Sequence, residues 1–262
     1  MGQIYTPQGR AREYAAKALN IYRRCDHRCV YCYNTSPRMM GPEFFQEPVV
    51  PLNQFRTEAL RRELQKGVPD DRVLLSFIGD PYCEAEYGFR YTRKVLEIFV
   101  EFQVRTAILT KGGSRVLRDV DLLLQLPDPW VGASLTFVDA EKSKMWEPGA
   151  ASPIDRMGTL KLLHDQGLRT WVSFEPMVSP IDNMELFRLT SSFVDHYKLG
   201  PLNHYKPTLE CPAPDVDWSA WGPALVQVLE DRGFSRTLTP DSLMPRTYYL
   251  KKDLVKRMGV SG

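Results

Sequence analysis

Short aliphatic runs alternate with helical patterns along most of the chain. Six β-branched or aliphatic runs predict strands at Ala18–Tyr22, Val73–Ile78, Val104–Thr110, Val131–Thr136, Arg169–Phe174 and Phe193–Leu199. Near-continuous apolar strands are typical of a parallel sheet covered by helices. The pattern therefore predicts an α/β fold, a partial (β/α)6 barrel of the TIM type, with six strand–helix units in place of eight.

Apolar residues at helical spacing predict the intervening helices. One helix has an apolar face made of Tyr91, Val95, Ile98 and Phe102. A second has a face made of Ile154, Met157, Leu160 and Leu163, with Ser152 and Pro153 at its start and Gly167 at its end. A last helix is expected from about Asp217 to Gly233, with one side made of Trp218, Trp221, Leu225 and Val228.

The composition predicts one globular domain. The chain has 262 residues, of which 43% are hydrophobic and 25% charged. We expect a single domain over 1–262, with a core at about 18–200 and a helical, basic extension at about 201–262. No internal repeat is evident. No apolar run approaches the roughly 18 residues of a membrane span, and the N-terminus lacks an apolar signal core, so the prediction is a cytoplasmic protein without membrane contact.

Positive charge is concentrated at the two ends of the chain, although the net charge is only +2. Residues 1–40 and residues 232–257 each hold seven Lys or Arg against two acidic residues. If the ends meet in the fold, they form one positive face that suits a polyanion. Two separate solvated charge runs are the alternative.

Polar clusters follow each predicted strand. In chain order they are RRCDHRCVYCYN, GDPYCEAE, KGG, SLT leading into WEPGAASPIDR, EPMVSP and KLGPLNHY. The carboxyl ends of parallel strands meet at one edge of a barrel, and chemistry in such folds collects there. The clusters therefore predict one shared site.

Three of the five cysteines lie within eight residues, at Cys25, Cys29 and Cys32. An odd count with such clustering does not indicate a disulfide framework. Three thiolates on one loop can hold three irons of a four-iron cluster and leave the fourth iron open. The alternatives are zinc held by three cysteines and His27, which is cramped between the first two, and thiols that bind no metal.

The motif CDHRCVYC resembles the signature of the radical S-adenosylmethionine (SAM) superfamily. The pieces FIGDPYCEAE, LTKG, SLTFVDAEKSKMWEPGAASPIDR and YYLKKDL resemble its spore photoproduct lyase-like branch over roughly residues 18–253. The resemblance implies a 4Fe-4S cluster on Cys25, Cys29 and Cys32. It also implies that S-adenosylmethionine binds the open iron and is cleaved reductively to a 5′-deoxyadenosyl radical. The electron would come from a donor such as flavodoxin or ferredoxin.

The resemblance also implies roles for residues at the strand ends. Tyr31 would contact the cofactor, and Tyr31 or Tyr33 would relay a radical, unless both simply pack the loop. Gly79 and Asp80 would receive the methionine amino group, unless they form a plain turn. The remaining cofactor contacts would come from Lys111, Ser134, Glu147, Glu175 and Lys198, although Lys111 also suits a solvated surface position and Glu147 suits a pair with Arg156.

Cys83 departs from the branch pattern. The lyase has a hydrogen-donating cysteine before the position of Asp80, whereas Cys83 lies three residues after it. Cys83 is therefore either a displaced hydrogen donor or a buried bystander. Because the cysteine loop begins at residue 25, we expect this protein to lack the segment that precedes the loop in the lyase.

Three functions follow as hypotheses. The first is radical chemistry on a nucleic-acid base, in repair or modification, with Trp146, Trp218, Trp221, Tyr248 and Tyr249 available for stacking, although a hydrophobic core explains most of these aromatic residues equally well. The second is the same chemistry on a peptide or small metabolite, which the near-neutral charge favours. The third is a non-catalytic iron–sulfur or zinc protein. The sequence indicates no oligomeric state.

Overall fold

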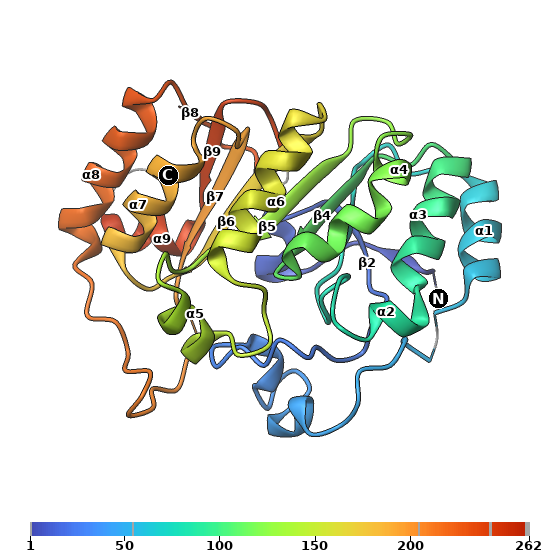
Figure 1. The fold of residues 1–262 in the computed structure, drawn as a ribbon, viewed down its shortest axis with the longest axis horizontal. Coiled ribbons are helices and arrows are strands. Elements are labelled where there is room, and N and C mark those ends of the chain that lie inside the picture. Colours follow the sequence, from blue (N-terminus) through green and yellow to red (C-terminus); the bar gives the residue numbers. More distant parts are fainter. Residues whose placement is uncertain (1, 54, 204, 241–242, 260–262) are drawn as a thin grey trace.

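The computed structural model describes residues 2–53, 55–203, 205–240 and 243–259, and one nine-stranded sheet organises them (Figure 1). In sheet order the strands are β1 (Ile4–Tyr5), β2 (Lys17–Leu19), β3 (Val73–Leu75), β4 (Thr106–Thr110), β5 (Trp130–Ser134), β6 (Arg169–Met177), β7 (His196–Pro201), β9 (Thr247–Leu250) and β8 (Ser235–Arg236). Every neighbouring pair is parallel except β1 with β2. The six predicted strands correspond to β2–β7, which confirms the α/β, partially closed barrel.

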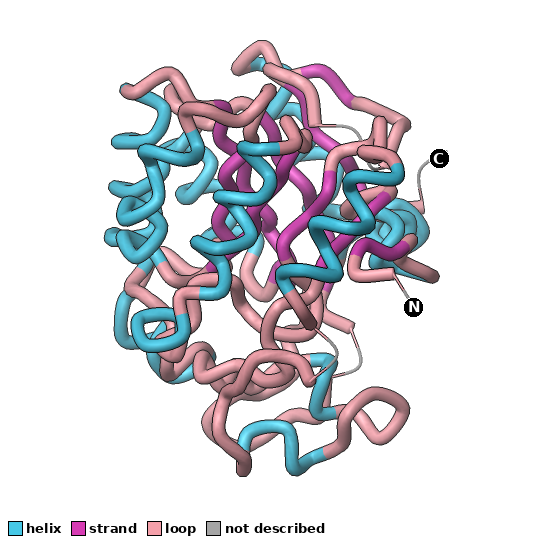
Figure 2. Tube along the Cα trace, turned by 90° about the vertical axis from the view of Figure 1, so that its right-hand side faces the viewer, coloured by secondary structure: helices cyan, strands magenta, loops and turns pink. Residues whose placement is uncertain are grey.

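Most of the helices cover one face of this sheet (Figure 1). They are α1 (Thr57–Lys66), α2 (Glu86–Phe89), α3 (Tyr91–Glu101), α4 (Val120–Leu123), α5 (Ala140–Trp146), α6 (Pro153–Asp165), α7 (Pro180–Thr190), α8 (Trp218–Asp231) and α9 (Lys252–Met258). Short 3₁₀ turns are η1 (Gly9–Glu13), η2 (Tyr33–Thr35), η3 (Pro42–Phe45) and η4 (Gly113–Asp119). Figure 2 shows long loops gathered at one end of the strands, where the cysteine loop lies.

Two hydrophobic cores join sheet and helices on the outer face. One packs α1, α3 and α4 on β2–β4, and the other packs α6, α7, α8 and α9 on β5–β7 and β9. Val95 and Ile98 of α3 are buried as predicted. Ile154 and Trp221 were wrongly predicted to be core residues: their exposed fractions are 75% and 37%. Pro153 and Arg156 of the first turn of α6 are buried, whereas Ile154 lies half a turn around the helix from Leu163 and points away from the sheet.

The predicted helix ends are confirmed at α6 and α8. The Ser152 hydroxyl accepts a hydrogen bond from the Asp155 N–H, and the Asp217 carboxylate accepts from the Ser219 and Ala220 N–H groups. Gly167 ends the turn after α6 with φ +86°, in the left-handed region that favours glycine.

The C-terminal extension is more than helical. Its β9 pairs with β7 and carries β8 at the sheet edge, so the extension completes the sheet. β9 has only four residues, and its aromatic pattern TYYL gave no clear strand signal. The two chain ends meet here, but through pairs of opposite charge: Arg10 pairs with Asp253, and Lys251 Nζ lies 3.8 Å from Glu13 Oε2.

The inner face of the sheet changes from apolar to polar toward the later strands. Ala18, Leu74 and Ala107 of the early strands pack with Trp130 and Trp171 in an inner core. On β6, Trp171, Ser173 and Glu175 alternate with Val172 and Phe174 of the outer core, as the pleat requires. Polar side chains therefore project into the barrel from its second half.

Candidate functional site

The cysteine loop lies between β2 and η2. Cys29 is buried, and Cys25 and Cys32 are half-buried. The thiols of Cys25 and Cys32 each interact electrostatically with that of Cys29. Burial, the largest cause, raises the pKa of Cys29 to about 12 and raises those of Cys25 and Cys32 as well. Buried thiols of this kind become thiolates when a metal replaces their protons.

The donor set fits a cluster with one open iron. The loop offers three sulfurs, and the other two cysteines lie elsewhere: Cys83 is in the outer core, and Cys211 contacts the Met145 carbonyl. Among the described residues, no fourth cysteine therefore joins the loop. Three thiolates plus one position left for an outside ligand is the set that the sequence predicted.

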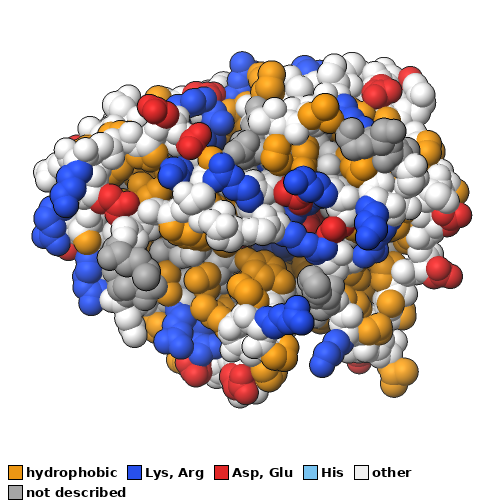
Figure 3. Space-filling view, turned by 180° about the vertical axis from the view of Figure 1, so that it is seen from behind, with side chains coloured by type: hydrophobic (Ala, Val, Ile, Leu, Met, Phe, Trp, Pro, Cys, Tyr) orange, Lys and Arg blue, Asp and Glu red, His pale blue; other side chains and the backbone are white. Residues whose placement is uncertain are grey.

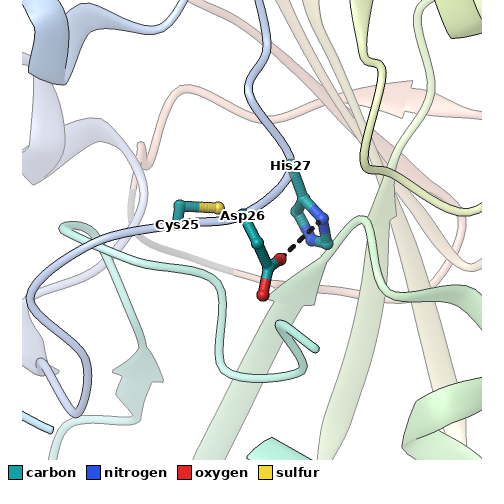
Figure 4. A group of neighbouring side chains, drawn as sticks. All are labelled: Cys25, Asp26 and His27. Carbon is teal, nitrogen blue, oxygen red and sulfur yellow. Dashed lines mark ion pairs between the residues drawn. The ribbon is translucent and has the colours of Figure 1, made fainter. Parts of the chain in front are cut away.

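His27 is held as a structural residue in this structure. Its Nδ1 is 3.0 Å from the Gly149 carbonyl oxygen and its Nε2 is 3.1 Å from Asp80 Oδ2. Figure 4 shows the His27 ring and the Asp26 carboxylate turned toward each other, with Cys25 beside them. Ligand atoms of these three residues lie within 4.8 Å of one another, which would suit a small ion. The two polar contacts of the ring disfavour zinc, because a zinc-bound nitrogen would have to give one up.

Asp80 links three loops. Its carboxylate accepts hydrogen bonds from the Thr110 hydroxyl at 2.6 Å and from the N–H groups of Lys111 at 2.7 Å and Tyr82 at 2.8 Å. Burial alone would raise the pKa of Asp80, but His27 and these donors lower it to about 2. The structure thus gives Asp80 a structural task, and its contact with a methionine amino group stays a prediction.

Gly79 is required by the protein's own backbone. A Cβ atom there would lie 2.4 Å from the Arg24 carbonyl oxygen and 3.1 Å from the Tyr22 Cβ. The chain entering the cysteine loop therefore occupies the space that the sequence assigned to a ligand. Arg24 itself is buried and donates to the carbonyl oxygens of Glu43 and Phe44.

Glu147 is the second buried carboxylate of the site. It accepts from Arg156 at 2.5 Å, from the Thr136 hydroxyl at 3.2 Å and from the Tyr31 hydroxyl. Burial would raise its pKa, yet Arg156 and Lys111 lower it to about 2. Of the two interpretations from sequence, the structure shows the pair with Arg156, and a ribose contact stays a prediction.

Lys111 keeps donors available beside the cysteines. Its Nζ lies 3.9 Å from Glu147 Oε1 and 5.5 Å from the centre of the Tyr31 ring. Among the described residues its ammonium makes no hydrogen bond, and only 15% of its side chain is exposed. Burial would lower its pKa, but Cys29 and Glu147 outweigh this and raise it. A buried, charged ammonium with free donors suits a carboxylate ligand.

The hydroxyl groups of the two tyrosines of the loop bond to different parts of the chain. Tyr31 points to Glu147, whereas the Tyr33 hydroxyl donates to the Phe77 carbonyl after β3. Tyr33 is 44% exposed. Burial raises the pKa of Tyr31, and the neighbouring Glu147 raises it further. Both are placed next to the cysteines, and their roles in cofactor contact or relay stay predictions.

Ser134, Glu175 and Lys198 lie on the later strands. The Ser134 carbonyl accepts from Arg156. Glu175 accepts from Lys251 and Tyr14. Lys198 is fully buried, and its Nζ donates to the carbonyl oxygens of Glu13, Tyr14 and Pro240. Lys198 thus holds the N-terminal segment in the barrel, a function that its strand-end position did not indicate.

Cys83 lies in the outer hydrophobic core with no exposed surface. Burial is the main reason why the pKa of the Cys83 thiol lies well above its usual value, and Asp26 and Asp80 raise this pKa further. This position favours the buried-bystander interpretation over hydrogen donation. Sequence reasoning also did not place Tyr14 and Lys251 in the barrel interior, because Tyr14 lies outside the strand-end motifs and the strand that Lys251 follows, β9, was not predicted.

Comparison with known proteins identifies the family. The family model of the Radical SAM superfamily matches residues 19–194. The chain belongs to this superfamily. Radical SAM proteins carry a 4Fe-4S cluster, bind S-adenosylmethionine and need an electron donor, and the three-cysteine loop of this chain is consistent with the cluster.

Among similar curated proteins, an uncharacterised protein of Methanocaldococcus jannaschii is 25% identical over 72% of this chain and 71% of its own length. An uncharacterised protein of Mycobacterium tuberculosis is 28% identical over 61% of this chain and 49% of its own length, so the match spans about half of it.

Similar solved structures share the fold. SuiB of Streptococcus suis bound to S-adenosylmethionine has a TM-score of 0.63 at 14% identity, over 92% of this chain and 52% of that one. Spore photoproduct lyase complexed with dinucleoside spore photoproduct has a TM-score of 0.63 at 14% identity, over 90% of this chain and 76% of that one. This chain is thus similar in fold to one protein with a peptide-bound structure and one with a nucleoside-bound structure.

Some of the basic residues at the two chain ends, which would form a positive face for a polyanion, pair with other residues of the protein. Arg24 and Lys251 are buried in pairs, whereas Arg23, Arg28, Lys252 and Lys256 are exposed. Four of the five stacking candidates were wrong, since all four are buried: Trp146, Trp218, Tyr248 and Tyr249.

Within the described residues, no helix combines the length and the apolar character that crossing a membrane requires.

Proposed function

We propose that this protein is a radical SAM enzyme that cleaves S-adenosylmethionine reductively and uses the product radical on a nucleic-acid base. The observation that carries the proposal is the loop of Cys25, Cys29 and Cys32 beside a buried ammonium with free donors, Lys111. When bound, the cluster supplies the electron that breaks a C–S bond of S-adenosylmethionine and yields the 5′-deoxyadenosyl radical.

The chain's own residues bind and orient. Lys111 is proposed to pair with the S-adenosylmethionine carboxylate. Tyr31 is proposed to contact the cofactor, with its ring fixed by the bond to Glu147. Asp80 and Glu147 hold the surrounding loops rigid through buried hydrogen bonds, which keeps reacting groups aligned. The apolar inner core excludes water from the radical.

The substrate class is proposed from the open side of the barrel. Figure 3 views the molecule from the side opposite the helices and shows a hollow lined with hydrophobic side chains and bordered by Lys and Arg. An apolar hollow with a basic rim suits an unstacked base with its phosphates outside. A donor such as flavodoxin or ferredoxin is proposed to supply the electron, and the cytoplasm is the proposed location.

The test is 5′-deoxyadenosine formation by anaerobically reconstituted protein with reductant, S-adenosylmethionine and a panel of DNA and RNA oligonucleotides. We expect at least one oligonucleotide to accelerate formation several-fold and to be altered in mass. Acceleration by peptides or by small metabolites of a cell extract, and by no nucleic acid, would contradict the substrate class while leaving the radical chemistry intact. Failure to form any 5′-deoxyadenosine would contradict both.

A further inference from the structure

The barrel interior holds a charged pair, Glu175 and Lys251, that is not part of the cysteine loop. Glu175 projects from β6, Lys251 follows β9 and Tyr14 precedes β2, so three distant segments meet there. Lys251 Nζ donates to Glu175 Oε2 at 2.6 Å, and the Tyr14 hydroxyl donates to the same oxygen. Lys251 is only 3% exposed. Buried charges are retained in proteins where partners hold them in place, as they do here.

The backbone is adapted to this group. The register of β6 against β7 shifts between Phe174 and Met177, and Glu175 lies within this irregularity. Such bulges re-aim a side chain and occur next to active sites. On β7, a Cβ at Gly200 would lie 2.8 Å from the Lys251 side chain and 2.9 Å from Glu175 Cδ. Glycine at that position leaves room for the pair.

One oxygen of Glu175 is left open. Both bonds use Oε2, and among the described residues nothing donates to Oε1. That oxygen is not sealed off, since 21% of the Glu175 side chain is exposed. The neighbouring carboxylate differs: Glu13 Oε1 accepts from Tyr249 and from the Lys252 N–H, and its Oε2 lies 3.8 Å from Lys251. Glu175 is thus a fixed acceptor with one vacant position.

Aromatic side chains surround this acceptor. Tyr14 and Phe77 make an edge-on contact with ring centres 6.1 Å apart, and both are half-buried against the inner core. Tyr33, 44% exposed, donates to the Phe77 carbonyl and interacts electrostatically with Glu175. An accessible carboxylate oxygen among aromatic rings suits a planar group that carries an N–H donor. It repels a phosphate.

We propose that Glu175 determines substrate specificity: its Oε1 accepts a hydrogen bond from a ring or exocyclic N–H of the base, which lies against the aromatic wall of Tyr14, Tyr33 and Phe77. This inference rests on the proposed function and names its recognition contact. It also moves Glu175 from the cofactor, where the sequence resemblance placed it, to the substrate. Lys251 and Tyr14 are positioning residues that fix the carboxylate through Oε2.

The test uses the reconstituted protein and short single-stranded homopolymers of each base. The variant E175Q removes the charge of the acceptor. E175D keeps the charge but has a shorter side chain, which moves the carboxylate away from the base. E185Q removes an exposed carboxylate and is the control. The readouts are the Kd for each homopolymer, the Kd for S-adenosylmethionine and substrate-free 5′-deoxyadenosine formation. A hydrogen bond to a charged group predicts that both Glu175 variants bind the preferred homopolymer about 10- to 100-fold more weakly.

In the control E185Q, homopolymer binding, affinity for S-adenosylmethionine and substrate-free cleavage should stay within about twofold of the wild type. Unchanged homopolymer binding in E175Q and E175D overturns the assignment. So does a loss of S-adenosylmethionine affinity, which returns Glu175 to the cofactor. Wild-type protein that cleaves S-adenosylmethionine but binds no homopolymer overturns the recognition contact together with the substrate class. Wild-type protein that cleaves none overturns the proposed function itself, so the failures are distinguishable.

Discussion

At the scale of single residues, the site is organised by two buried carboxylates that the protein satisfies itself. Asp80 and Glu147 each accept several internal hydrogen bonds, and the pKa of each is about 2. Residue types at strand ends predicted that these acids belong to the site. They did not predict which partner each would take, because partner choice depends on loop paths that only the fold defines. Lys111 is the predicted residue whose donors stay available.

Removing the partner of Glu147 should be costly. In R156M the carboxylate remains buried without its guanidinium, and we expect the free energy of unfolding to fall by about 3–5 kcal/mol. The double variant E147Q/R156M removes the uncompensated charge and should recover part of this loss. Urea unfolding measures both. Equal stability of R156M and the wild type would contradict a structural role for the pair.

The same pair predicts a pH dependence. The pKa of Glu147 falls from 4.5 to about 2 on folding, so its stabilisation is present above pH 4.5 and is lost as the pH falls toward 2. Linkage gives about 3 kcal/mol for this one group. The unfolding free energy of the wild type should therefore fall more steeply than that of E147Q between pH 4.5 and pH 3, a window inside the range over which Glu147 loses its stabilisation. Parallel pH profiles would argue against the shift.

At the scale of elements, strand and helix positions could be predicted, and fine boundaries could not. All six predicted strands exist, since long apolar runs need burial on both faces. β9 was missed because a four-residue strand has too little pattern, and Ile154 was misassigned because repeated steps of three residues drift around an α-helix, away from the face of Leu163. A repeated SPID sequence starts α6 and α7. Asp155 of α6 accepts a hydrogen bond from the Ser114 N–H, which follows β4. Asp182 of α7 accepts one from the Val138 N–H, which follows β5.

Glycines give a direct test of how closely these elements pack. In G79A the new Cβ would lie 2.4 Å from the Arg24 carbonyl oxygen, a backbone atom, so we expect a loss of about 1–3 kcal/mol in unfolding free energy. The matched control is G158A in α6, where no atom lies within 4 Å. That change should stabilise the helix by about 0.5–1 kcal/mol. Similar effects of the two substitutions would refute the close approach.

At the scale of the whole molecule, the N-terminal segment closes part of the barrel interior. Lys198 clamps Glu13 and Tyr14 from inside, and Arg10 pairs with Asp253 at the surface. The chain ends meet, which was the condition for one positive face, but their contact neutralises charge as well as gathering it. Length, composition and charge counts could not reveal this clamp, because it joins residues 185 positions apart.

Removal of the clamp should loosen this segment. In K198M the carbonyl oxygens of Glu13 and Tyr14 lose their donor, and we expect faster backbone hydrogen exchange over residues 9–16. The control K161M breaks an exposed pair on α6 and should leave that exchange unchanged. Exchange in K198M that matches the control would show that Lys198 does not hold the segment.

The central claim is that Cys25, Cys29 and Cys32 hold a cluster that cleaves S-adenosylmethionine. The most direct measurement is the amount of 5′-deoxyadenosine formed under anaerobic, reducing conditions by iron-loaded wild type and by C29A. The account predicts 5′-deoxyadenosine from the wild type, and loss of both cluster absorbance and product in C29A. A wild type that leaves S-adenosylmethionine intact, or a C29A variant with full turnover, would contradict it.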